Sequence, residues 1–249
     1  MYRSESSENG GGYSSIASVY DEWMADFDYA SIINLLDECQ IKRGAKVLDA
    51  CCGTGRLTEM LSASGATIIG FDRSPEMLTI ALERLKGKPN VEFRLADLRE
   101  DLLLRDVELV TCTLDSMNYL SPNDIGSAIG ILSSYIHDGG TLLFDMNTSY
   151  KLKEIFGNTT YAESREKFAY IWSNRLSASH IDFDIDIFKH AEHDLYSRNF
   201  ETHRQFFYDE DVIIGELARN GFRKTFTFDG YSTQPTSPTT QRTVFLSTR

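Results

Sequence analysis

The segment that most constrains the fold is Val47-Leu48-Asp49-Ala50-Cys51-Cys52-Gly53-Thr54-Gly55-Arg56. A short apolar and β-branched run at 46–50 predicts a buried strand, which ends in a turn containing Gly53 and Gly55. Because glycine has no side chain, a ligand can approach the backbone where the next helix begins. An ordinary tight strand-to-helix turn is the alternative interpretation of this segment taken alone.

Segments with strand-like and helix-like patterns alternate after this turn. We expect helices at 54–64, 75–86 and 125–136, and strands at 67–72, 91–95, 108–114 and 140–146. Ser74 before Pro75 predicts an N-cap and a first helical turn. Two further strands are expected at 222–228 and 243–247. Such alternation predicts an α/β fold: a Rossmann-like, mostly parallel seven-stranded sheet with helices on both faces.

Two regions depart from this alternation. Between 161 and 208 the apolar residues recur at every second position, as in Ile181, Phe183, Ile185 and Ile187, which predicts a half-buried antiparallel sheet. The helix 209–220, closed by Gly221, follows it. We therefore expect a Rossmann-like domain at 41–147 and 209–249 with a small inserted sheet at 148–208. Two helices are expected at 13–40, after a polar, disordered tail at 1–12.

Acidic residues close the second and third expected strands. Asp72 follows Gly53 at close to the offset of about 20 residues at which a carboxylate meets a ribose diol. Asp97 can accept a hydrogen bond from an adenine amino group, and Leu98 can cover the adenine ring. Three acids at successive strand ends, Asp49 included, favour a nucleoside site over solvated strand ends.

The turn itself indicates which nucleotide binds. A dinucleotide site has a third glycine where this chain has Thr58. Asp49 stands just before the turn, where its carboxylate would repel a pyrophosphate but attract the ammonium of an amino acid. The pattern predicts a nucleoside that carries a cation.

These residues, with Asp72, Asp97 and the segment 112–120, resemble the class I S-adenosylmethionine-dependent methyltransferases. The resemblance covers about 13–249 and is strongest over 46–144. Residues 13–21, 115–120 and the inserted sheet resemble a bacterial small-molecule branch that includes sugar N,N-dimethyltransferases. Two features depart from related patterns: the chain has Cys51-Cys52 where one cysteine is usual, and it lacks the Asn-Pro-Pro-Tyr motif of enzymes that methylate bases or glutamine amides.

The resemblance implies S-adenosyl-L-methionine as cofactor and assigns its contacts. The methionine part would lie at Asp49, Ala50, Cys51 and Gly53, the ribose at Asp72, and the adenine at Asp97 and Leu98. By the same resemblance, Arg73 and Met77 would flank the nucleoside, and Thr113 and Leu114 would lie beneath it. Tyr13 and Tyr20 would belong to an N-terminal lid over the methionine end.

The acceptor and a base are less constrained. Methyl transfer from a sulfonium needs alignment and exclusion of water, and a base only if the acceptor must lose a proton. Glu201, His203 and Gln205 share one face of an expected strand, which faces either solvent or the acceptor. We take His203 and Asp115 as the candidate catalytic residues, and either could be the base. A structural role is the alternative for His203, and we expect Asp115 to orient a polar or cationic acceptor.

Composition limits the other possibilities. With 25 Lys and Arg against 37 Asp and Glu, the net charge of −12 disfavours a nucleic-acid partner. The spacing of the four cysteines does not fit a zinc site. The pattern Asp182-x-Asp184-x-Asp186 lacks the glycine and the glutamate of a calcium loop, so we expect these acids to form a solvated strand face. We therefore expect no metal. No stretch approaches the ~20 apolar residues needed to cross a bilayer, and the N-terminus has no apolar signal core, so we expect a cytoplasmic protein without membrane contact. We expect a monomer or a homodimer.

The sequence thus predicts a methyltransferase that acts on the amine or hydroxyl of a small molecule. Two rivals remain open. A noncatalytic protein that binds adenosylmethionine would have the same cofactor residues without an acceptor site. An NAD-dependent oxidoreductase is disfavoured by Asp49 and Thr58.

Overall fold

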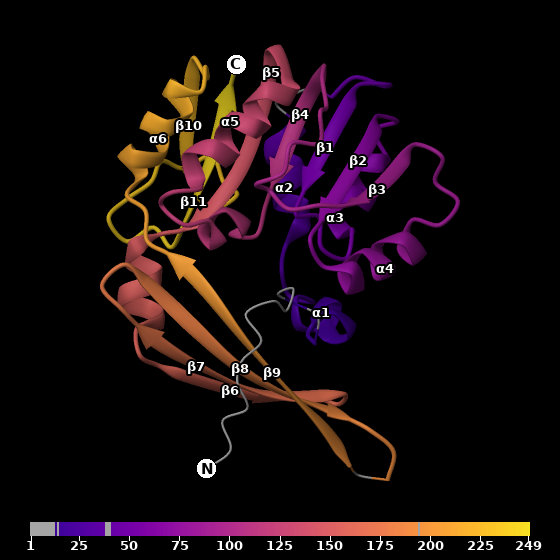
Figure 1. Ribbon diagram of the computed structural model, residues 1–249, viewed down its shortest axis with the longest axis vertical. Helices are drawn as coiled ribbons and strands as arrows, with labels where there is room; N and C mark the ends of the chain where they lie inside the picture. The colour runs from indigo at the N-terminus through magenta and orange to yellow at the C-terminus, as the bar shows by residue number, and fades with distance from the viewer. Residues whose placement is uncertain (1–12, 14, 38–40, 194) are drawn as a thin grey trace.

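The computed structural model describes residues 13, 15–37, 41–193 and 195–249, so the expected tail at 1–12 lies outside the described residues. Its upper half in Figure 1 is a seven-stranded sheet of order β10-β11-β5-β4-β1-β2-β3. The strands β1 to β5 pair in parallel, while β11 runs antiparallel to β5 and β10. Their bounds are β1 Lys46–Ala50, β2 Thr67–Asp72, β3 Val91–Leu95, β4 Val107–Cys112, β5 Ile136–Asn147, β10 Lys224–Asp229 and β11 Arg242–Thr248. The expected mostly parallel sheet is confirmed.

Both faces of this sheet are buried because successive residues of the central strands point to opposite sides. Val47 and Leu109 pack with helices α2 and α3 on one face, and Leu48 and Val110 pack with α5 and α6 on the other. The helices are α1 Ala17–Trp23, α2 Tyr29–Asp37, α3 Arg56–Ser62, α4 Pro75–Arg84, α5 Ile125–Tyr135 and α6 Glu210–Arg219. As expected, Ser74 caps α4 by accepting a hydrogen bond from the Met77 amide.

A separate four-stranded antiparallel sheet lies below the first one in Figure 1, in the order β6-β7-β8-β9. Its strands are β6 Thr160–Ser164, β7 Phe168–Leu176, β8 His180–His190 and β9 Tyr196–Phe206. Ile181, Phe183, Ile185 and Ile187 are all buried on one face of β8, which confirms the period-two interpretation. Helix α1 lies between the two sheets, and its apolar residues pack on this inner face of the four-stranded sheet.

The outer face of β8 differs from the expectation of a solvated acidic strand. Asp182 is only 6% exposed, because the guanidinium of Arg204 on β9 donates two hydrogen bonds to its carboxylate. In the antiparallel register these two residues lie directly opposite each other. The alternation of acids along β8 is therefore matched by arginines on the neighbouring strands, a cross-strand pairing that one strand's sequence cannot reveal.

Two short elements join the sheets and were not expected from the sequence. A 3₁₀-helix, η1 (Ser116–Tyr119), follows β4, and a π-helix, η2 (Lys151–Phe156), follows β5. The side chain of Asn118 in η1 is fully buried and hydrogen-bonds the backbone of Asn147 at the end of β5 and of Phe206 at the end of β9. This one amide thereby ties the two sheets together. None of the described helices is long and apolar enough to cross a membrane.

Candidate functional site

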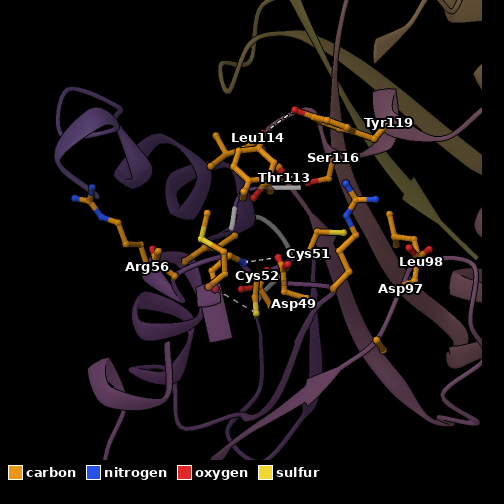
Figure 2. Close-up of a pocket in the computed structure, with 18 of the residues that line it drawn as sticks. Asp49, Cys51, Cys52, Arg56, Asp97, Leu98, Thr113, Leu114, Ser116 and Tyr119 are labelled. Atoms are coloured by element: carbon orange, nitrogen blue, oxygen red, sulfur yellow. Dashed lines mark hydrogen bonds between the residues drawn. The ribbon is translucent and has the colours of Figure 1, made fainter. Parts of the chain in front are cut away.

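A cavity of about 1040 Å³, partly open to solvent, lies at the carboxyl ends of the parallel strands. Figure 2 shows Arg56 on one side of it, Asp97 and Leu98 on the opposite side, and Asp49 between them. Of the residues assigned to the cofactor from the sequence, twelve line this cavity: Tyr13, Tyr20, Asp49, Cys51, Gly53, Asp72, Arg73, Met77, Asp97, Leu98, Thr113 and Leu114. Ala50 is fully buried in the core beside the cavity and is absent from its lining.

The glycine turn leaves its backbone open to the cavity. Gly53 has φ +55°, a left-handed conformation that favours glycine, and a Cβ added there would meet no atom within 4 Å. Gly55 has φ +79°, and a Cβ at this residue would lie 3.1 Å from the side chains of Ala81 and Leu85. The first glycine thus gives access to a ligand, and the second allows α4 to pack closely on the turn.

Asp49 holds a buried carboxylate at the end of β1. Only 1% of the residue is exposed, and the hydroxyls of Thr58 and Thr111 donate hydrogen bonds of 2.6 and 2.8 Å to its two oxygens. Burial raises the pKa of this carboxyl to about 6, although both hydroxyls favour the charged form. Thr58 is the residue that replaces the third glycine of a dinucleotide site. Its role as a partner of Asp49 was not predicted from the sequence.

Asp72 at the end of β2 braces the same turn. Its carboxylate oxygens each accept one backbone hydrogen bond of 2.9 Å, from Gly53 and from Ser74. Partial burial raises the pKa of Asp72, while these amides counteract the shift. Each oxygen keeps a further lone pair, so the side chain can also accept hydrogen bonds from a ligand diol.

The far end of the cavity is lined by Asp97 and Leu98. The guanidinium of Arg99 forms a two-pronged ion pair with Asp97, with hydrogen bonds of 2.7 and 2.8 Å, which lowers the pKa of the carboxyl. Leu98 is buried and offers an apolar surface. Arg99 also lines the cavity and was not among the predicted residues.

A second cavity, with an empty volume of about 760 Å³, lies between η1, α1 and the inner face of the four-stranded sheet. We call it the acceptor cavity, after the role that we propose for it. It shares Tyr13, Tyr20, Leu114 and Tyr119 with the first cavity, so the two spaces have a common wall. Its other walls combine aromatic and aliphatic side chains with six polar ones: Asp115, Asn147, Lys151, His203, Gln205 and Arg242.

The common wall is held from the N-terminal side. The carboxylate of Glu201 on β9 accepts hydrogen bonds from the backbone amides of Tyr13 and Ser15, and the Tyr13 hydroxyl lies 2.7 Å from the Tyr119 hydroxyl. Asp21 in α1 accepts a hydrogen bond from Thr54 in the glycine turn and pairs with Arg84 of α4. Helix α1 and the residues before it are therefore fixed to both the glycine turn and the inserted sheet.

His203 faces inward, which decides between the two orientations that the sequence left open. It is 3% exposed, its ring centroid lies 4.6 Å from that of Tyr13, and its Nε2 lies 2.9 Å from Glu201 Oε2. Burial raises the pKa of Glu201, but the hydrogen bonds from His203 and Ser15 outweigh it and the pKa is lowered. An ionised Glu201 only accepts hydrogen bonds, so His203 Nε2 is the donor in this pair.

Asp115 lies in a strained loop after β4, where Leu114 and Asp115 have φ values of +59° and +54°. The fully buried carboxylate of Asp145 stabilises this loop by accepting hydrogen bonds from both backbone amides and by pairing with Arg242. Arg242 and Gln205 in turn donate to the Asp115 carboxylate at 2.7 and 2.6 Å.

These contacts bear on the chemistry of Asp115. Burial raises its pKa, but Arg242 and Lys151 together outweigh burial and lower it. A carboxylate with a lowered pKa and two bound donors is a poor base and a good positioning group. Asp145 and Arg242 were missed by sequence reasoning, because no motif links residues so far apart in the chain.

Comparison with known proteins agrees with this geometry. Residues 47–140 match a family model described as a methyltransferase domain. The chain is 31% identical over 235 residues to "Putative methyltransferase YqeM" of Bacillus subtilis, covering 90% of this chain and 92% of that protein.

Solved structures also resemble this fold. An S-adenosylmethionine-dependent methyltransferase of Clostridium acetobutylicum superposes with a TM-score of 0.82 at 27% identity, covering 95% of this chain and 98% of that chain. The amino pentose methyltransferase CalS10 of Micromonospora echinaspora, solved with bound S-adenosylmethionine, shares the fold at 18% identity and a TM-score of 0.73, covering 98% of this chain and 100% of that chain. The chain belongs to the S-adenosylmethionine-dependent methyltransferases.

Proposed function

We propose that this enzyme transfers the methyl group to an amine or hydroxyl of a small molecule that binds in the acceptor cavity. The observation that carries the proposal is the wall shared by the two cavities, formed by Tyr13, Tyr20, Leu114 and Tyr119. A small acceptor in one space would contact the methyl group of a donor in the other beside these shared residues, where the two spaces adjoin. The activity of CalS10 on an amino pentose, in a protein of the same fold, is consistent with such an acceptor.

The first cavity, which we call the cofactor cavity, has the groups that adenosylmethionine requires. We assign the ammonium of the methionine part to Asp49, the ribose diol to Asp72, and the adenine to Asp97 and Leu98. The open space over Gly53 supports this assignment, since a side chain there would fill it. Arg73, Met77, Thr113, Leu114 and Cys51 complete the proposed contacts, and Tyr13 and Tyr20 cover the methionine end.

When bound, S-adenosylmethionine supplies a methyl group on a positively charged sulfur, which leaves as a neutral thioether. Tyr13 and Tyr119 exclude water from the common wall, where a desolvated, aligned approach accelerates the displacement. Where the acceptor nitrogen or oxygen must lose a proton, His203, held by Glu201, is the base that we assign to accept it. Asp115 positions the acceptor through Gln205 and Arg242.

A methyl-transfer screen tests the proposal. The purified protein is incubated with methyl-labelled adenosylmethionine and, in parallel, with small amines and phenols, total tRNA, and a protein extract. Label in small molecules alone is the expected result. Label confined to RNA or protein would contradict the small-molecule assignment, and label nowhere, despite tight cofactor binding, would favour the noncatalytic alternative.

Cytoplasmic location and a monomeric or homodimeric state are part of the same proposal. Gel filtration with light scattering checks the oligomeric state. An NAD-dependent oxidoreductase is no longer a rival, because the chain belongs to the methyltransferases.

A further inference from the structure

Lys151 stands out among the cations of the acceptor cavity. Arg242 is shared between the carboxylates of Asp115 and Asp145, and His203 is paired with Glu201. Among the described residues, no carboxylate oxygen lies within 4.0 Å of the Lys151 ammonium, although the side chain lines the cavity. Of the described lysine and arginine side chains that line this cavity, Lys151 is therefore the one without a carboxylate in direct contact.

The π-helix η2 explains why Lys151 faces the cavity. In this segment the Gly157 amide donates to the Leu152 carbonyl, five residues earlier, so residues five apart share a face. Lys151 and Phe156 are such a pair: the ammonium lies 5.2 Å from the centroid of the Phe156 ring, and both side chains line the cavity. In an α-helix, residues five apart would point in different directions. Single π-helical turns occur frequently at functional sites.

The surroundings of Lys151 suit a charged ammonium with donors to spare. Its Nζ donates to Asn147 Oδ1 at 2.9 Å, and the face of the Phe156 ring attracts the charge. Burial lowers the pKa of Lys151, and the nearby negative charge of Asp115 counteracts this shift. An ammonium has three N–H donors, and the described side chains use one of them.

The rest of the cavity defines what could accept these hydrogen bonds. The carboxylate of Asp115 is already bound by Arg242 and Gln205, so it does not neutralise Lys151 directly. The N–H donors of Lys151 that no described side chain uses can form charge-assisted hydrogen bonds to the two oxygens of an acceptor carboxylate. Next to Lys151 the walls are aromatic, formed by Phe156, Trp172 and Phe183, with ring centroids 5.2 to 5.6 Å apart.

We propose that Lys151 forms a carboxylate subsite in the acceptor cavity, so that the acceptor is a ring-bearing carboxylic acid whose amine or hydroxyl faces the common wall. The acid group is held at Lys151 and the ring lies against Phe156 and Trp172. This inference rests on the proposed function and deepens it, because it names the class of small molecule. Lys151 is on this account a specificity-determining residue that contacts the acceptor.

Matched pairs of probe compounds test the subsite. The acids 4-hydroxybenzoate and 4-aminobenzoate are each compared with the corresponding neutral primary amide. Labelled methyl transfer measures the reaction, and calorimetry in the presence of S-adenosylhomocysteine measures binding. We expect the acids to bind and react about tenfold or more better than the amides, as the loss of one charge-assisted hydrogen bond implies. Lys151→Met should remove this preference by raising KM for the acids about tenfold, with kcat within about threefold, and Lys151→Arg should restore much of it.

Lys153→Met is the matched control, because Lys153 lies in the same π-helix but is exposed and packs over Phe207. It should leave acid binding unchanged, and neither variant should change adenosylmethionine affinity by more than about twofold. The proposal is overturned if amides bind as well as acids, if no acid binds, or if Lys151→Met lowers kcat at constant KM. Failure of the proposed function is distinct: no small molecule would be labelled, while the binding arm would still report on the subsite.

Discussion

Two carboxylates of the cofactor cavity are ionised only at a cost. Burial raises the pKa of both Asp49 and Asp72. Within the described part of the chain, the side-chain partners of the Asp49 carboxylate are two threonine hydroxyls and no cation. A buried acid of this kind is stabilised when a cationic ligand arrives, because the ligand supplies the missing counter-charge. If the proposed contact with Asp49 holds, cofactor binding is coupled to the loss of a proton from this carboxyl.

The pH dependence of cofactor binding follows from Asp49. Its pKa of about 6 in the folded protein is higher than the value of about 4 in the unfolded chain. The folded state without ligand therefore loses stability as pH rises from about 4 to about 6, by on the order of 3 kcal/mol in total. A cation prefers the ionised carboxylate. Affinity for adenosylmethionine should therefore rise between about pH 5 and 7, with proton release near pH 6 that calorimetry in two buffers detects. Asp49→Asn should bind weakly and release no proton; proton release that persists in this variant would contradict the assignment.

Asp72 should contribute directly to affinity. Asp72→Ala removes the acceptor of two hydrogen bonds to the ribose, each about 1.5 to 3 kcal/mol before solvent compensation, so the affinity for adenosylmethionine should fall at least about tenfold. Calorimetry measures this change, and circular dichroism checks that the variant is folded. Asp138→Ala, at a carboxylate that is 80% exposed, is the control and should bind as the wild type does. An unchanged affinity in Asp72→Ala would remove Asp72 from the ribose site.

His203 should control the chemical step if the acceptor loses a proton in the enzyme. His203→Ala should lower kcat about 10²-fold, because it removes the proposed base. Asp115→Asn should instead raise KM for the acceptor, because it weakens the contacts to Arg242 and Gln205. Steady-state kinetics from about pH 6 to 9 separate the two effects. Wild-type kcat in His203→Ala throughout this range would leave alignment as the sole source of catalysis.

At the scale of elements, a helix or strand could be predicted where its apolar residues recur at a regular spacing. The alternation in β8 identified a half-buried strand, and the Ser74-Pro75 pair located the start of α4. Strand β5 begins at Ile136 and not at the expected residue 140, because an irregularity in its pairing with β4 lengthens it. The π-helix η2 was not predicted, since a six-residue segment has too few turns to show a period.

The inserted sheet should shape the acceptor cavity without affecting the cofactor. Phe183→Leu trims an aromatic wall of the acceptor cavity, so KM for the acceptor should change by about fivefold or more while cofactor affinity stays within about twofold. Asp184→Asn is the matched control on the outer face of the same strand, where the carboxylate pairs with Arg175. A collapse of cofactor affinity in folded Phe183→Leu would contradict this division of labour.

At the scale of the whole molecule, Asn118 determines how firmly the two sheets are joined. Asn118→Ala removes three buried hydrogen bonds and leaves backbone groups of Asn147 and Phe206 unpaired, which should lower the free energy of unfolding by about 2 to 4 kcal/mol. Urea denaturation measures the loss. Asn123→Ala, at an exposed site, should stay within about 0.5 kcal/mol of the wild type. Equal stability of the two variants would show that other contacts hold the sheets together.

The sequence predicted the cofactor cavity better than the acceptor cavity for a physical reason. Cofactor candidates such as Asp49, Gly53 and Asp72 follow consecutive strands of one parallel sheet, so their spacing in the chain reflects their spacing in the fold. The acceptor cavity instead combines Lys151, His203 and Arg242 with Tyr13 from the other end of the chain. Such a set depends on how the two sheets pack, and no local pattern encodes it.

The junction at Asn118 also has an evolutionary consequence. The inserted segment leaves the larger sheet at the end of β5 and returns at the end of β9, and both ends are bound by the same side chain. One contiguous stretch of chain can therefore change in sequence while the strand ends that carry Asp49 and Asp72 stay in place.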